Sequence, residues 1–349
     1  MATEVESLRR ALVAEGQTVR TVGELGALVS HRVGLFIPHD GYLLTGLDPL
    51  TRAAGFYAKE HFYGAQAAQR LYAERPDIDP FPCPFASLLD GPRRVGVLNA
   101  DSPEHRRSER LHDVMAGEGF GCELRVALTH GGLPWGLLTL LRTTGSRPFT
   151  AEEEARAERL AGPLATALKV FGRGLCAGPN RHAAEPGVVV VGPDDTVRMT
   201  PTAVDWLAEL NPHPLATAQA LGTTVWTVVW MARYSGAPAV SRIPTPGGWV
   251  AVQAQLLGAE GGDEVVVTIR PASGAGLLPT FAAWHDITRR ERAVAALLLE
   301  GLPAKRIARR LGMSPHTVND HLKAVYRKTG VSGRDELVAV LLAGVAGAW

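Results

Sequence analysis

Two hydrophobic runs separated by a turn form the clearest strand pattern in the first half of the chain. The runs are Glu123–Leu128 and Trp135–Arg142, and the segment between them contains Gly131-Gly132-Leu133-Pro134. Strand-forming residues on both sides of a glycine-rich turn are typical of a β-hairpin. We therefore predict two antiparallel strands here.

A helix is predicted to follow this hairpin. Thr150, with Glu153 three residues later, has the spacing of a capping box. The triplet Glu152-Glu153-Glu154 places negative charge at the positive end of the helix dipole. We expect this acidic triplet to be a solvated cap.

A second region shows two strand patterns, then helix, then three further strand patterns. This order is typical of a small α+β sensor domain built on an antiparallel sheet. The expected elements are strands at Gly187–Val191 and Thr196–Met199, a helix near Thr202–Leu210, and strands at Val240–Ile243, Trp249–Leu257 and Glu264–Arg270.

The last part of the chain contains four short helical patterns. The first, Arg289–Glu300, ends at Gly301, and the second begins near Pro303 and ends at Gly312. Ser314 is a suitable N-cap for a third helix and Pro315 suits its first position. Two helices joined by so short a connection cross steeply, which predicts a helix-turn-helix.

The predicted third helix has separate apolar and polar faces. At 100° per residue, its apolar positions fall within a sector about 100° wide, and its polar positions occupy a second sector of about the same width. Such a helix can pack one face on its domain and present the other to base edges in the major groove. Taken alone, the polar face is equally consistent with solvated charges. The apolar positions are Val318, Leu322, Val325 and Tyr326, the polar ones are Asn319, Asp320, Lys323 and Arg327, and Thr317, His321 and Lys328 lie beyond them, where they could reach phosphates.

Loop-rich segments divide the 349 residues into domains. Gly172–Gly187 and Pro271-Ala272-Ser273-Gly274-Ala275-Gly276 are the best linker candidates. We therefore expect a multidomain α+β protein. Its parts are a leading helix at 1–19, a first domain at 20–172, a linker at 173–185, a second domain at 186–271, a linker at 272–284 and a third domain at 285–349.

The net charge of +1 hides an uneven distribution. Residues 285–349 hold 11 basic and 6 acidic side chains, so the rest of the chain is mildly acidic. A local charge of +5 on the helix-turn-helix segment favours nucleic acid as its partner.

Cysteine usage and the termini predict a cytoplasmic protein. Cys83, Cys122 and Cys176 form no CxxC pair, and the first residues lack the pattern of a signal peptide. The apolar tail 337–349 is shorter than the roughly 20 residues that span a bilayer, so we expect no membrane partner.

The C-terminal segment resembles the LuxR-type, also called NarL-type, helix-turn-helix. The resemblance covers about 60 residues without a gap. Two positions depart from the family pattern: Arg306 stands where an acidic residue is frequent, and Pro303 stands where a Ser cap is usual. The residues that carry the resemblance are Thr288-Arg289-Arg290-Glu291-Arg292, Ile307-Ala308, Ser314-Pro315-His316-Thr317-Val318-Asn319-Asp320-His321-Leu322 and Lys328-Thr329-Gly330-Val331.

The resemblance implies a transcriptional regulator that binds paired half-sites of double-stranded DNA as a homodimer. The fourth helix, Asp335–Ala346, would join the subunits together with the sensor domains, and RNA polymerase is a further candidate partner. By position in the motif, Asn319, Asp320 and Lys323 would contact base edges, and Lys305 and Thr317 would contact phosphates. With the flanking positions, the expected DNA-binding set is Lys305, Thr317, Asn319, Asp320, His321, Lys323, Arg327 and Lys328.

The first two domains resemble the GAF-like (α/β) and PAS-like (α+β) sensor domains of a group of actinobacterial LuxR-type regulators. The GAF resemblance rests on the runs from Val95 to Arg125 and from Trp135 to Thr150. It implies a small-molecule or redox signal of unknown identity, with Cys122 and Trp135 as weak candidates for ligand contacts. No spacing of the histidines or cysteines predicts a metal site, a cofactor or a catalytic residue.

Two alternatives to the regulator remain open at this point. One is a cysteine-dependent enzyme on the GAF-like domain that uses Cys83 and Cys122. The other is a sensor region that acts only as a scaffold for dimerisation and partner docking.

Overall fold

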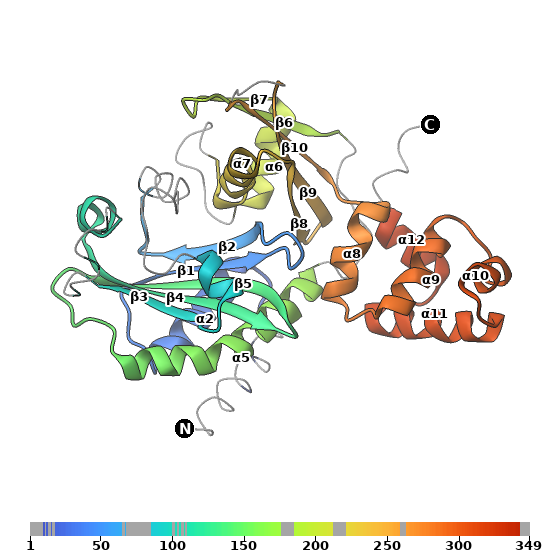
Figure 1. Cartoon of the computed structure of the whole chain (residues 1–349), viewed down its shortest axis with the longest axis horizontal. Helices are drawn as coiled ribbons and strands as arrows, with labels where there is room; N and C mark the ends of the chain where they lie inside the picture. The colour runs from blue at the N-terminus through green and yellow to red at the C-terminus, as the bar shows by residue number, and fades with distance from the viewer. Residues whose placement is uncertain are drawn as a thin grey trace.

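Three bodies follow one another along the chain, and a helix joins the last of them to the other two (Figure 1). The structure is a computed structural model. It describes residues 18–64, 85–99, 110–175, 185–211, 221–258 and 263–342, with isolated residues between 10 and 15, at 67 and between 102 and 108. Most of the predicted leading helix and most of the first predicted linker lie outside the described residues.

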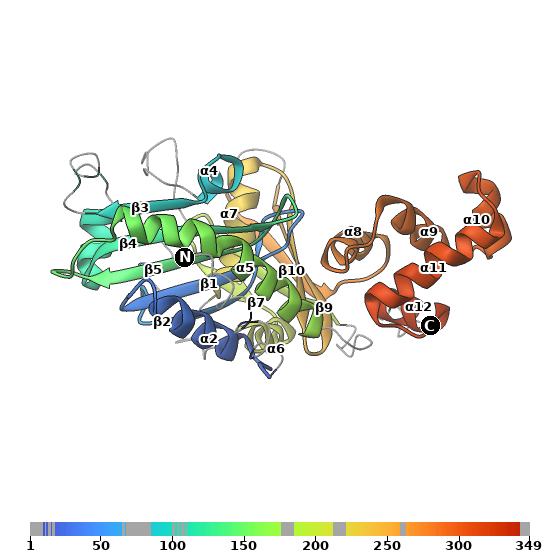
Figure 2. The same ribbon diagram turned by 90° about the horizontal axis from the view of Figure 1, so that it is seen from below.

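A five-stranded antiparallel sheet forms the centre of the first domain. Its strand order is β2-β1-β5-β4-β3, and α5 packs along β4 and β5 (Figure 2). The domain is therefore α+β. Its elements are α2 (Val22–Gly34), β1 (Gly41–Leu47), β2 (Ala54–Glu60), α4 (Phe85–Asp90), β3 (Val95–Asn99), β4 (Phe120–His130), β5 (Leu133–Thr143) and α5 (Ala151–Leu175).

The predicted hairpin is present as β4 and β5. His130 pairs with Leu133, so Gly131 and Gly132 alone form the turn, with φ angles of 62° and 76°. A two-residue turn with both central residues at positive φ is the I′ type, which glycine adopts without strain.

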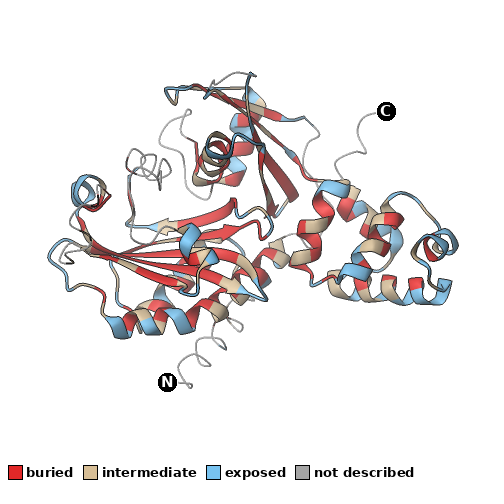
Figure 3. Cartoon of the chain, in the orientation of Figure 1, coloured by how far each residue is buried: buried red, intermediate tan, exposed pale blue. Residues whose placement is uncertain are grey.

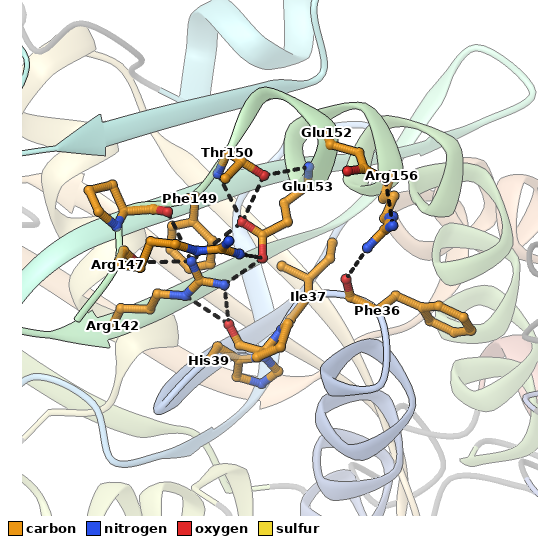
Figure 4. Close-up of polar contacts among 12 residues, drawn as sticks. Phe36, Ile37, His39, Arg142, Arg147, Phe149, Thr150, Glu152, Glu153 and Arg156 are labelled. Atoms are coloured by element: carbon orange, nitrogen blue, oxygen red, sulfur yellow. Dashed lines mark hydrogen bonds and ion pairs between the residues drawn. The ribbon is translucent and has the colours of Figure 1, made fainter.

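The predicted capping box is also present at the start of α5, but the acidic triplet is not entirely solvated. Thr150 Oγ1 accepts from the Glu153 N–H, and the Thr150 N–H donates to the Glu153 carboxylate at 2.8 Å (Figure 4). Glu153 is only 3% exposed and accepts from Arg142 at 2.7 Å, whereas Glu152 is exposed. Burial raises the pKa of Glu153, but hydrogen bonds from Arg142 and Thr150 outweigh it and leave that pKa lowered. Glu153 therefore joins the helix start to the sheet.

The second domain repeats the sheet topology of the first. Its order, β7-β6-β10-β9-β8, is the same as that of the first sheet when strands are counted from the start of each domain. The predicted sequence of two strands, helix and three strands is confirmed. The elements are β6 (Gly187–Val191), β7 (Val197–Met199), α6 (Pro201–Leu210), α7 (Thr223–Ser235), β8 (Ala239–Thr245), β9 (Gly248–Leu256) and β10 (Val265–Pro271).

The two domains contact each other through β2 of the first and α7 and β8 of the second. Ser241 donates to the Ala54 carbonyl at 2.8 Å, and Thr224 donates to the Gly55 carbonyl. Asp48, which is fully buried, accepts from the Arg242 side chain at 3.3 Å and from Thr280. The contact is therefore polar as well as apolar.

The segment 272–284, expected to be a linker, contains helix α8 (Gly274–Trp284). Leu277, Phe281 and Trp284 of this helix are buried. Figure 3 shows buried segments along the ribbon of α8. The Trp284 ring lies between those of Trp135 and Trp249, at centroid distances of 4.9 and 6.1 Å. One continuous group of buried residues consequently runs from the first domain through α8 into the C-terminal helices.

The structure contains a helix at each of the four predicted C-terminal positions, and residues 343–346 of the predicted fourth helix lie outside the described residues. The helices are α9 (Arg289–Leu299), α10 (Ala304–Leu311), α11 (Pro315–Thr329) and α12 (Arg334–Leu342). Pro303 takes the N-cap position of α10 without a side-chain hydrogen bond, as expected where the usual Ser is missing. Across the described residues, no helix combines the length and the hydrophobicity needed to cross a membrane.

Candidate nucleic-acid interface

The connection between α10 and α11 sets the angle at which α11 leaves the domain. Gly312 ends α10 with a φ of 65°, and the Met313 N–H donates back to the Ala308 carbonyl at 3.0 Å. Ser314 Oγ then accepts from the Thr317 N–H at 3.0 Å, with Pro315 at the first helical position. The start of α11 is thus fixed by two residues of its own sequence.

The apolar face of α11 packs into the domain as predicted. Val318, Leu322 and Val325 are buried, and Tyr326 packs beside them. They join Ile307 of α10 in the continuous core. The burial of this face fixes which residues of α11 point to solvent.

The opposite face of α11 is polar and exposed. Asn319, Asp320, Lys323 and Arg327 all lie on this face. Asp320 Oδ2 lies 3.5 Å from Nε2 of the exposed His316, a contact that is ionic only when the histidine is protonated. A helix with amide, carboxylate and cationic groups on one exposed face can read base edges.

The three predicted flanking residues have different surroundings. Thr317 is exposed, and its hydroxyl contacts that of Ser314 at 2.9 Å, whereas His321 is half-buried. Lys328 is occupied within the protein: Nζ donates to Glu291 Oε2 at 2.7 Å and to the Asp286 carbonyl at 2.8 Å. The structure therefore separates Lys328 from the other seven predicted contacts, because its ammonium already has two acceptors.

Helix α10 presents a cationic surface that the sequence analysis did not include beyond Lys305. Arg306, Arg309 and Arg310 are exposed with Lys305, while Ile307 and Ala308 are buried. Arg310 pairs with Glu300 at 3.1 Å. The helical projection used for α11 would have found this surface, since the four cations fall within about 140° of the helix circumference.

Neither weak ligand candidate in the first domain is accessible to solvent. Cys122 is buried and accepts from the Phe149 N–H at 3.5 Å, and burial raises the pKa of its thiol to about 11. Trp135 is buried and donates to the His130 carbonyl at 3.0 Å. A protonated, buried thiol is a poor nucleophile, so Cys122 does not support the enzyme alternative. Cys83, its proposed partner, lies outside the described residues.

A buried charge cluster in the first domain was also missed by the sequence analysis. Glu123 accepts from Arg110 at 2.9 Å, from Arg125 at 2.5 Å and from the Tyr63 hydroxyl at 2.7 Å. Burial raises the pKa of Glu123, but the two arginines outweigh it and lower that pKa to about 2. These residues come from three separate segments of the chain, so no local sequence pattern predicts the cluster. Among the described residues, no three His, Cys, Asp or Glu side chains gather as metal ligands would.

A protein family and several curated relatives match part of the chain. The family model described as bacterial regulatory proteins, luxR family, matches residues 285–341. The spore germination protein GerE of Bacillus subtilis is 41% identical over 56 residues, which cover 16% of this chain and 76% of GerE. The transcriptional regulatory protein UhpA of Escherichia coli is 43% identical over 83 residues, which cover 22% of this chain and 42% of UhpA.

Longer relatives match over a small share of their own length. A putative HTH-type transcriptional regulator of Mycobacterium bovis is 41% identical over 76 residues, and the match covers 22% of this chain but 8% of that protein.

Two solved structures are similar to larger parts of the chain. Escherichia coli SdiA is 14% identical, with a TM-score of 0.37 over 96% of this chain and 95% of SdiA. The GAF domain of a phosphoenolpyruvate-protein phosphotransferase from Coxiella burnetii is 20% identical, with a TM-score of 0.34 over 50% of this chain and 96% of that domain.

The relatives and the geometry agree on the C-terminal domain. GerE is matched over 76% of its length. The residues matched by the family model, 285–341, contain the helices α9 to α11 and nearly all of α12. The chain therefore belongs to the LuxR family of bacterial regulatory proteins.

Proposed function

We propose that this protein is a sequence-specific DNA-binding transcriptional regulator whose helix α11 enters the major groove. The observation that carries the proposal is the division of α11 into two faces. Val318, Leu322 and Val325 are buried, while Asn319 and Lys323 are exposed on the opposite side. In a helix-turn-helix this arrangement leaves base-reading side chains free while the domain holds the helix in place.

We assign three kinds of contact to the predicted residues. Asn319, Asp320 and Lys323 would contact base edges, with Asp320 accepting from a cytosine amino group. Lys305, Thr317, His321 and Arg327 would contact phosphates or the groove edge, and Arg306 and Arg309 of α10 would add phosphate contacts. Lys328 could reach a phosphate only by leaving Glu291 and the Asp286 carbonyl.

We propose that the protein binds paired half-sites as a homodimer. A two-fold dimer places two recognition helices one helical turn of DNA apart or a multiple of that distance. Helix α12 would contribute to the dimer contact, but its residues Leu337, Val340 and Leu341 are buried within the protomer. We propose that the sensor domains supply the rest of the subunit interface. A small-molecule effector, RNA polymerase as a partner and a cytoplasmic location complete the proposal.

The test is a binding titration with DNA selected from a random pool by the full-length protein. Lys323→Ala is expected to weaken binding by about 1–3 kcal/mol and to relax the preference at one base position, because a base contact is lost. Arg198→Ala is the matched control, since Arg198 is an exposed cation on the second domain that pairs with Glu264 at 2.8 Å.

Equal binding by wild type and Lys323→Ala would remove Lys323 from the interface. If the pool yields no preferred sequence at all, the proposed function itself fails.

A further inference from the structure

The hinge between the sensor domains and the helix-turn-helix domain is the short segment between α8 and α9. Helix α8 is fixed to the sensor side, because the Trp284 ring packs against Trp135 of β5 and Trp249 of β9. It also lies so close to Gly172 of α5 that no Cβ fits there. The next helix, α9, begins at Arg289 and belongs to the DNA-binding domain. Residues 285–288 therefore connect the two parts, beside the packing of α8 on α9 and α12.

Helix α5 holds the hinge from the sensor side by the side chain of Asp286. Lys169 Nζ lies 2.5 Å from Asp286 Oδ1, and an Arg173 guanidinium nitrogen lies 2.9 Å from Oδ2. Arg173 also donates to the Trp284 carbonyl. Lys169 is only 8% exposed and lies 4.8 Å from the Trp135 ring centroid. A cation buried this far needs a charged partner, and Asp286 provides it.

Helix α11 holds the same residue from the DNA-binding side by its backbone. Lys328 Nζ donates to the Asp286 carbonyl at 2.8 Å and, at the same time, to Glu291 at 2.7 Å. Lys328 lies in the last turn of α11, the helix that carries the base-reading face. Asp286 is thus bound on one side by α5 of the first sensor domain and on the other by the recognition helix α11.

The backbone of Asp286 is consistent with a residue held from both sides. Its φ is 52°, in the left-handed region that non-glycine residues adopt at some cost. Such conformations persist where the surrounding contacts impose them. The side chain of Asp286 is nevertheless 62% exposed, so it is not needed to fill the core.

We propose that Asp286 is the positioning residue that fixes the orientation of the DNA-binding domain on the sensor domains, and thereby the half-site spacing that a dimer accepts. The part of this inference that concerns half-site spacing rests on the proposed function. The part that concerns the orientation of the domains in the free protein does not. Asp286 does not contact DNA; it acts through Lys169, Arg173 and Lys328. When the two recognition helices of a dimer are held rigidly, the dimer binds half-sites at one spacing only. When the hinge is loose, the dimer binds half-sites at several spacings.

The experiment compares full-length wild type with Asp286→Gly and Asp286→Asn. Glycine adopts a positive φ without strain, so Asp286→Gly removes the carboxylate without distorting the turn. Asparagine also tolerates this conformation and removes only the charge. Asp195→Gly is a matched control, because Asp195 has a φ of 63° and pairs with Arg233 at 2.7 Å within the second domain.

Two readouts are measured. The first is small-angle X-ray scattering of the free protein, in which both Asp286 variants should show a larger radius of gyration than wild type and Asp195→Gly should not. The second is affinity for the selected paired site with a spacer lengthened by half a turn of DNA. This insertion should cost wild type roughly tenfold more affinity than it costs Asp286→Gly, because the lost contacts include two charge-assisted hydrogen bonds.

A scattering curve of Asp286→Gly that superposes on that of wild type overturns the proposal without any DNA. If wild type binds a paired site and both proteins lose the same affinity on lengthening the spacer, the positioning role is also overturned. If wild type binds no preferred sequence, the proposed function fails, and the scattering comparison still decides the role of Asp286 in the hinge.

Discussion

Burial determines the charge of His285, the residue that follows helix α8. Its ring packs on Phe281 at a centroid distance of 4.3 Å, and Nδ1 lies 3.3 Å from the Lys328 carbonyl. Burial lowers the pKa of His285 to about 4, from an ordinary value of 6.5. The imidazole is therefore neutral in the folded protein at physiological pH.

This neutral state predicts a pH dependence of stability. Between pH 6.5 and 4 the unfolded chain takes up a proton at His285 and the folded chain does not, so the free energy of unfolding falls as the pH falls. Wild type should lose about 2 kcal/mol more free energy of unfolding between pH 7 and pH 5 than His285→Phe, because the variant has no imidazole to protonate. Urea titrations of both proteins at the two pH values measure this difference, and identical losses would contradict a buried neutral His285.

At the residue scale, prediction from the sequence succeeded where the partner is local. Thr150 and Glu153 are three residues apart, and their mutual hydrogen bonds are present. Prediction failed where the hydrogen-bond partner is distant in the sequence. The buried Glu153 accepts from Arg142 of the preceding strand, and Glu291, which accepts from Lys328, lies 37 residues before it. A cation that appears free in a helical projection can be neutralised by a carboxylate that only the tertiary fold brings near.

At the scale of elements, α10 carries the most concentrated positive charge in the DNA-binding domain. Lys305, Arg306 and Arg309 are exposed on this eight-residue helix, and the Arg310 charge is shared with Glu300. In helix-turn-helix proteins the first helix crosses the phosphate backbone. We expect α10 to supply affinity that does not depend on sequence.

Replacing Arg306 and Arg309 together by Ala should reduce the slope of log affinity against log salt concentration by about two, since each lost phosphate contact removes about 0.9. The base preference should be unchanged. Fluorescence anisotropy at several salt concentrations measures the slope, and Arg198→Ala with Arg270→Ala removes two exposed arginines of the second domain as a control. An unchanged slope in the α10 variant would mean that this surface faces away from DNA.

The elements themselves were predictable where local signals are strong. Ser314-Pro315, Gly301 and Gly312 mark helix ends in the sequence, and the structure confirms them. Helix α8 was not predictable in the same way, because Gly274, Gly276 and Pro279 give it the composition of a linker. It is stabilised by Trp135 and Trp249, which are distant in the sequence.

At the scale of the whole molecule, two domains of equal sheet order are joined to the C-terminal helix-turn-helix domain by a shared core. The continuous group of buried residues through α8 means that the DNA-binding domain is not attached by a free tether. A change in the position of α5 would therefore reach α11 through Trp284 and Asp286. The uneven charge of the chain follows the same division, since the first two domains are mildly acidic and the C-terminal domain is basic.

The measurement that tests the central claim most directly is the affinity of the full-length protein for its selected paired site, compared with a scrambled duplex of the same length and base composition at the same salt concentration. We predict that the selected site binds at least roughly a thousandfold more tightly, as is typical of sequence-specific regulators. Equal affinity for the two duplexes would show that the exposed face of α11 does not read DNA sequence and would contradict the account.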